Sequence, residues 1–164
     1  MILHSLAAAG GYRSNAIKNL IAAVWMAAAC APLPAAELLA RWASANITPD
    51  RPVPLAGQFH IRISKSVYGP LTATALALEN NGEQVVMVSL DVVAESKELL
   101  EDLRARLKIT LPEFDSRKLL LNATHAHTAP EMREGNYEIL EDVMKPPEFL
   151  AFLTERVGDA VVKA

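Results

Sequence analysis

The chain has 164 residues, of which 51 % are hydrophobic and 21 % are charged, a balance typical of one globular domain with a core. Its net charge of −3 does not favour binding to nucleic acid, so no nucleic-acid partner is expected. Cys30 is the single cysteine, which excludes an internal disulfide and a cysteine-based zinc site. Any bound metal must therefore be held by histidine and carboxylate.

The first 36 residues differ from the rest in composition. Arg13 and Lys18 precede an apolar run over residues 20–31, and alanine and proline dominate residues 31–36. A basic flank, a short apolar run and small residues are the parts of a secretory signal peptide, and the run is shorter than the roughly 20 residues that span a membrane. A buried alanine-rich helix is the alternative. We expect a signal peptide over 1–36, a mature domain over 37–164, and a secreted or periplasmic location.

The mature part begins with irregular and extended segments. An apolar stretch from residue 37 leads into an extended segment that ends at Pro49. Prolines and a glycine over residues 50–57 indicate a loop, because proline fixes φ and lacks a donor. Apolar and polar residues then alternate over 59–64, which predicts a half-buried strand.

A hairpin follows. Residues 72–79 and 84–90 are strand candidates, and Asn80-Asn81-Gly82 lies between them. Asparagine and glycine tolerate positive φ, so this tripeptide is the best hairpin turn in the chain. The second strand is nearly all apolar, which predicts a central place in the sheet.

Two helices and another strand complete the chain. Apolar residues at helical spacing predict a helix over 92–108, which Pro112 ends, and three leucines in a row predict a buried strand over 118–123. A second helix begins at Pro146 and stays in register up to Ala164. This order predicts an α/β fold with a mixed β-sheet flanked by helices. We expect it to be the incomplete N-terminal part of a larger domain.

The stretch Asn122–Pro130 carries the candidate chemistry. His125 and His127 follow a buried strand, and residues two apart in an extended chain point to the same side. Ligand sites in α/β sheets lie at the carboxyl ends of strands, and imidazole is a good zinc ligand. The pair therefore suggests a metal site. The alternative is a surface turn that happens to hold two histidines.

Other polar residues offer weaker candidates. Asp91 ends the strand over 84–90, where it could orient a ligand histidine as a second-shell residue or cap the next helix. We interpret His60 as an exposed strand residue and Glu131 as a solvated loop acid.

The sequence resembles the N-terminal catalytic region of the neutral/alkaline ceramidase family over about residues 44–164. Thr124–Pro130, which reads THAHTAP, matches that family's THTHSGP-like segment and is the most specific part of the resemblance. Further similar segments are Ala45–Pro49 (a DITP-like opening), Leu55–Gly57 (a glycine turn), Val67–Glu79 and Val85–Asp91 (two strands).

The resemblance implies a function. Members of this family bind zinc through His, His, Glu and Tyr, and a serine acts on the amide bond of ceramide. His125 corresponds to a zinc ligand, and His127 to a second active-site histidine that contacts the metal or the substrate. The other ligands and the nucleophilic serine follow later in family members, beyond Ala164. The resemblance thus implies Zn²⁺ as cofactor, a lipid-like small-molecule substrate and contact with a peripheral membrane surface.

The sequence also departs from the family pattern. Ala126, Thr128 and Ala129 differ from the motif, and Tyr68-Gly69 stands where many relatives have His-Asp. These changes affect the expected substrate more than the expected metal binding. Three hypotheses follow: a zinc-dependent hydrolase of amide bonds in N-acyl lipids, a different ester or amide hydrolase on the same scaffold, and a non-catalytic fragment or binding module.

Overall fold

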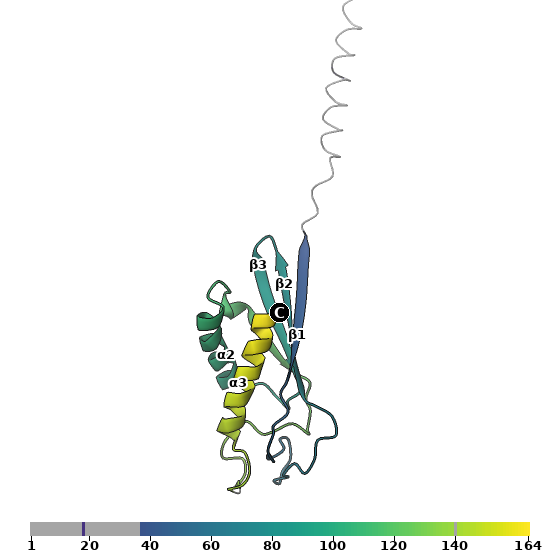
Figure 1. Cartoon of the computed structure of the whole chain (residues 1–164), viewed down its shortest axis with the longest axis vertical. Coiled ribbons are helices and arrows are strands. Elements are labelled where there is room, and N and C mark those ends of the chain that lie inside the picture. Colours follow the sequence, from purple (N-terminus) through teal and green to yellow (C-terminus); the bar gives the residue numbers. More distant parts are fainter. Residues whose placement is uncertain (1–17, 19–36, 140) are drawn as a thin grey trace, which may run out of the picture. The chain divides into compact units, whose positions relative to one another are not determined.

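Four strands and two helices build the part of the chain that follows the predicted signal peptide (Figure 1). The computed structural model describes residue 18, residues 37–139 and residues 141–164, so nearly all of that predicted peptide lies outside the described residues. The elements are, in chain order, β1 (Leu38–Asn46), β2 (Thr72–Asn80), β3 (Glu83–Leu90), α2 (Lys97–Thr110), the 3-10 turn η1 (Ser116–Lys118), β4 (Leu119–Ala123) and α3 (Pro146–Lys163).

The strands form a mixed sheet in the order β1-β2-β3-β4. The first two pairs are antiparallel, whereas β3 and β4 run parallel and are joined by the crossover helix α2. The predicted α/β fold with a mixed sheet is therefore confirmed. The predicted interior place of β3 is confirmed as well, because this strand pairs on both sides.

The β2–β3 connection is a hairpin, as predicted, and its turn has two residues where the sequence indicated the tripeptide Asn80–Gly82. Asn80 pairs with Glu83, and the two residues between them, Asn81 and Gly82, have φ values of 51° and 79°. Positive φ at both central positions gives the backbone twist that matches the flanking strands. This turn sets the register that places Val86, Val88 and Leu90 on one face of the sheet.

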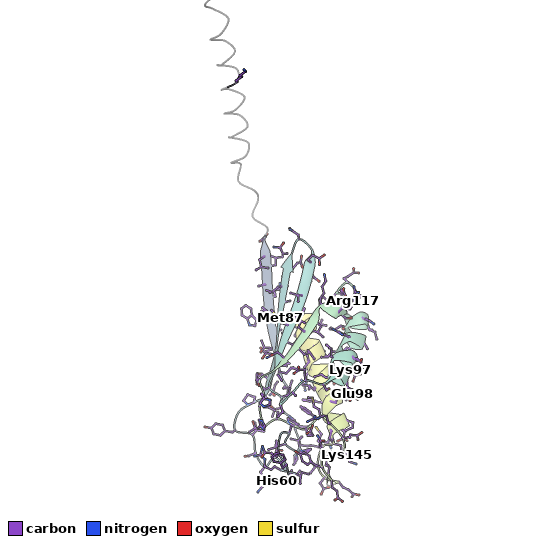
Figure 2. All side chains as sticks on the ribbon, turned by 180° about the vertical axis from the view of Figure 1, so that it is seen from behind. His60, Met87, Lys97, Glu98, Arg117 and Lys145 are labelled. Atoms are coloured by element: carbon purple, nitrogen blue, oxygen red, sulfur yellow. The ribbon has the colours of Figure 1, made fainter. Side chains whose placement is uncertain are left out.

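Both helices cover that same face. The buried leucines of α2 and the buried apolar residues of α3 share one core with the inward side chains of the sheet. Figure 2 shows the sheet from behind, with Met87 on the side that carries no helix. The helices therefore leave the opposite face of the sheet without cover in the described part of the chain.

The uncovered face carries an apolar row of side chains. Strand register places Trp42, Leu76, Met87 and Leu120 in one row across all four strands. Trp42 is 75 % exposed, Leu120 54 % and Met87 38 %. A sheet normally buries such a row against another layer.

The structure corrects three sequence-based expectations. Residues 59–64 form no strand: Ile63 makes a single bridge to Pro54, and Phe59 is fully exposed. The helix predicted from Val92 begins at Lys97, because Ser96 caps it by accepting a hydrogen bond from the Leu99 amide. Strand β1 already begins at Leu38, so it is longer than the predicted extended segment that ends at Pro49. Within the described residues, no helix is long and apolar enough to span a membrane.

Candidate functional site

The histidine loop, Thr124–Pro130, starts where β4 ends. The Thr124 amide donates to the Leu90 carbonyl at 2.9 Å, and the Ala126 amide donates to the Val92 carbonyl at 3.0 Å. These bonds continue the β3–β4 pairing beyond the strand. Between them, His125 has φ of +65°, a left-handed conformation that is uncommon for a residue with a side chain. Such strain persists where surrounding contacts enforce it, and it is frequent at functional sites.

The two histidine rings meet at one point. The Nε2 atoms of His125 and His127 are 3.2 Å apart, and the ring planes are nearly perpendicular at 87°. The predicted convergence is thus present. Its cause differs from the one inferred from an extended chain, because the left-handed backbone at His125 and the turn after it aim the rings.

The opposite nitrogen of each ring faces a backbone carbonyl. His125 Nδ1 is 2.8 Å from the Val93 oxygen, and His127 Nδ1 is 3.1 Å from the Gly57 oxygen. A carbonyl only accepts, so each Nδ1 must carry a proton to form these bonds. In the neutral rings both Nε2 atoms then present lone pairs to the same space.

A loop 70 residues upstream holds His127 in place. The Ala56 amide donates to the Ala129 carbonyl at 2.9 Å, and the Glu131 amide donates to the Pro54 carbonyl at 2.8 Å. Gly57 follows with φ of +76° and lies directly against the His127 ring. A Cβ on Gly57 would stand 2.3 Å from His127 Nδ1, so only glycine fits here without displacement.

Arg62 completes this support. Its Nη2 donates to the His127 carbonyl at 3.0 Å, and its own carbonyl accepts from the Leu55 amide at 2.8 Å. The Arg62 Nε is buried and has no hydrogen-bond partner among the described residues. Arg62 is a site residue that the sequence does not reveal. The contact is long-range, so residue spacing carries no sign of it.

Asp91 supports the histidine loop from the sheet. Its carboxylate accepts hydrogen bonds from the Thr72 amide, the Thr72 hydroxyl and the Thr124 hydroxyl, at 2.9, 2.8 and 3.1 Å. Burial raises the pKa of Asp91, but these three bonds outweigh it and hold the pKa below its usual value. Asp91 bonds the residue before His125 rather than a histidine ring. The alternative of a helix cap is wrong, because Ser96 is the cap.

Glu131 is a buried acid, contrary to the prediction of a solvated one. Only 3 % of this residue is exposed. Its carboxylate accepts from the Met132 and Arg133 amides at 3.0 Å each, and from Asn136 Nδ2 at 3.0 Å. Burial raises the pKa of Glu131, but the hydrogen bonds from Arg133 and Asn136 and the Arg133 charge outweigh it and hold the pKa below its usual value. Glu131 thereby orders the turn that follows the histidine loop.

A cavity of about 510 Å³ lies beside the histidine loop. Thr128 and Pro130 of that loop form one part of its wall, and Val67 and Tyr68 form another. The lining combines apolar and polar side chains, and its charged members are Asp50, Arg51 and Lys65. A small molecule with an apolar part and a polar part would fit such a wall.

The described residues bring two metal-binding side chains together. They contain no group of three or more histidine, cysteine, aspartate or glutamate side chains that could hold a metal ion. A catalytic zinc needs about three protein ligands and one open position. His125 and His127 can thus form part of such a site.

The fold is similar to that of solved ceramidases. The neutral ceramidase from Pseudomonas aeruginosa matches with a TM-score of 0.67 and 17 % identity, over 79 % of this chain and 21 % of that one. A ceramidase complexed with C2 matches with a TM-score of 0.58 and 18 % identity, over 78 % of this chain and 20 % of that one. No protein-family model and no curated protein sequence matches the chain. The chain therefore has the fold of part of a ceramidase and spans about a fifth of the length of these structures.

Proposed function

We propose that this chain provides the histidine pair of a zinc-dependent hydrolase that cleaves amide bonds in N-acyl lipids, such as ceramide to a sphingoid base and a fatty acid. The observation that carries the proposal is the 3.2 Å distance between His125 Nε2 and His127 Nε2. The ceramidase fold and the THAHTAP sequence at the end of β4 support the same function.

The spacing of the two nitrogens suits a zinc ion. Zn–N distances are about 2.0–2.1 Å, so two imidazole ligands at a tetrahedral angle lie about 3.3 Å apart. Without a cation or a proton between them, two lone pairs at 3.2 Å repel each other. The Val93 and Gly57 carbonyls would fix the tautomer that metal binding requires, as is usual for zinc-bound histidine.

Bound zinc would polarise the amide carbonyl and lower the pKa of the attacking oxygen. The residues of this chain position that chemistry. His125 and His127 offer their Nε2 lone pairs, while Gly57 and Arg62 hold the His127 ring and backbone. Asp91 accepts a hydrogen bond from the Thr124 hydroxyl and so fixes the position of the backbone directly before the strained His125.

The remaining components of the active site would come from other parts of the same domain. Resemblance to the family implies that further zinc ligands and the nucleophilic serine lie beyond Ala164. Because the chain spans about a fifth of the solved ceramidases, the activity belongs to a complete domain. We further propose that the domain is exported through the leader over residues 1–36 to a secreted or periplasmic location.

A zinc titration of the purified chain tests the site. We expect one weakly bound zinc ion, which His125→Ala and His127→Ala each remove in calorimetry and elemental analysis. His60→Ala is the matched control, because His60 is exposed on the neighbouring loop, and this variant should bind zinc like the parent. In a chain extended to the end of the domain, His125→Ala should also lose amide hydrolysis. Unchanged zinc binding by His125→Ala would refute the proposal.

A further inference from the structure

We propose that the segment Gln58–Gly69 docks the protein on a lipid surface, with Phe59 and Tyr68 as the side chains that enter it. This inference rests on the proposed function, because an N-acyl lipid resides in a bilayer and must be reached there. Two features of the segment support this proposal: its aromatic and aliphatic side chains are exposed, and its charged side chains are all basic.

Four large apolar side chains of the segment face solvent. Phe59 and Tyr68 are fully exposed, and Val67 and Ile61 are also among the exposed large hydrophobic residues. Single exposed apolar residues are normal on protein surfaces, but four within twelve residues form a concentration. Aromatic side chains are favoured at the boundary between lipid and water, where the ring enters the apolar layer and a polar end stays wet.

The charge of the segment suits an anionic lipid surface. Between Gln58 and Gly69 the chain carries Arg62 and Lys65 and no aspartate or glutamate, although the whole chain has a net charge of −3. Lys65 is exposed and forms no salt bridge within the described part of the chain. Each lysine or arginine near such a surface strengthens binding about five-fold.

The segment also lies next to the histidine loop. Gly57, the residue before it, faces His127 Nδ1, and Arg62 within it holds the His127 carbonyl. Val67 and Tyr68 line the cavity whose other wall is Thr128 and Pro130. Figure 2 places His60 at the end of the sheet opposite the β2–β3 turn. Docking through this segment would therefore bring the mouth of the cavity to the lipid.

Vesicle flotation with the full chain tests the proposal. The monomer, isolated by size exclusion, is mixed with neutral phosphatidylcholine vesicles or with vesicles that contain phosphatidylglycerol; neither contains ceramide, and no zinc is added. We expect binding to the anionic vesicles that weakens with added salt. Phe59→Ser and Tyr68→Ser should each lower the partition coefficient about ten-fold, and Lys65→Gln about five-fold.

Trp42→Ser is the matched control, because Trp42 is an exposed aromatic residue on the bare face of the sheet. It should leave vesicle binding unchanged. An equal loss in Trp42→Ser would assign the contact to the sheet face and overturn the proposal, as would full binding by the Phe59→Ser/Tyr68→Ser double variant. Circular dichroism confirms that the variants fold. Because ceramide and zinc are absent, failure of the proposed hydrolase activity leaves this result unaffected, and the two proposals can fail separately.

Discussion

Gly57 and His127 are in contact across 70 residues of sequence, and the contact leaves no room for a side chain at position 57. The Gly57 carbonyl faces His127 Nδ1 at 3.1 Å, and a Cβ at position 57 would stand 2.3 Å from the same atom. This contact links the loop between β1 and β2 to the imidazole that we assign to zinc. The ring can therefore be displaced without changing either histidine.

Gly57→Ala should lower zinc affinity 10- to 100-fold, the usual cost of losing a partner behind a zinc-bound histidine. The variant should also lose about 1–2 kcal/mol of stability, because alanine is strained at a φ of +76°. Calorimetric zinc titration and chemical denaturation measure the two effects.

Gly82→Ala separates the two effects. Gly82 has a similar φ of +79°, but a Cβ there would meet nothing within 4 Å. It should show the same loss of stability with unchanged zinc affinity. Equal zinc affinity in both variants would contradict the role assigned to Gly57.

The sequence predicts the features that neighbouring residues determine and misses those that depend on long-range contacts. The β2–β3 hairpin is specified by Asn81 and Gly82 themselves, and α3 by its apolar spacing and Pro146, so both follow from neighbouring residues. Residues 59–64 alternate like a strand, yet the prolines of the facing loop lack donors and only the Pro54–Ile63 bridge forms.

The candidate site shows the same division. His125 and His127 are visible in the sequence because they are two residues apart in a distinctive motif. Gly57 and Arg62 reach His127 through tertiary contacts, which spacing along the chain does not encode. The sequence predicts a solvated Glu131, because acidic side chains are usually exposed. Its burial depends on hydrogen bonds from backbone amides that come together only in the folded turn.

Glu131→Gln should cost about 1–3 kcal/mol of stability at pH 7, because an amide NH₂ replaces an oxygen that accepts hydrogen bonds in a buried place. The folded-state pKa of Glu131 lies below its ordinary value of 4.5, so its stabilisation is complete above about pH 4.5 and disappears as the pH falls through the folded pKa. The lowered pKa of Asp91 acts in the same direction. Urea denaturation at several pH values measures the free energy of unfolding and its dependence on pH.

The parent protein should therefore lose stability on acidification below about pH 4.5, and Glu131→Gln should show a shallower dependence on pH. Glu138→Gln, at an exposed position in the same region, is the control and should match the parent. A parent and a Glu131 variant with identical pH profiles would show that Glu131 is not bound as an anion in the folded state.

Export should remove the residues before about Ala36. The basic flank, apolar run and alanine- and proline-rich end of residues 1–36 motivate this expectation. N-terminal sequencing of the protein recovered outside the cytoplasm gives the answer. A recovered protein that begins at Met1 would mean that this segment is retained.

Leu120→Lys should make the chain more soluble. Leu120 belongs to the uncovered row of the sheet, and a charge there would interrupt an apolar surface that favours aggregation. Static light scattering over a concentration series should show less association than in the parent. Leu119→Lys, one residue away but buried against the helices, should instead prevent folding. Unchanged association in a folded Leu120→Lys protein would show that this row does not drive aggregation.

The 164-residue chain by itself should not hydrolyse ceramide. A catalytic zinc requires about three protein ligands, and the described residues bring together only His125 and His127. Hydrolysis also needs an activated nucleophile, and among the described residues no serine forms a hydrogen bond with either histidine ring. The chain covers only about a fifth of the ceramidases whose fold it shares. Release of fatty acid from ceramide micelles, measured with and without zinc, should equal the rate without protein. A chain extended to the end of the domain should show zinc-dependent release, and robust release by the short chain would overturn the view that its two histidines are only part of the site.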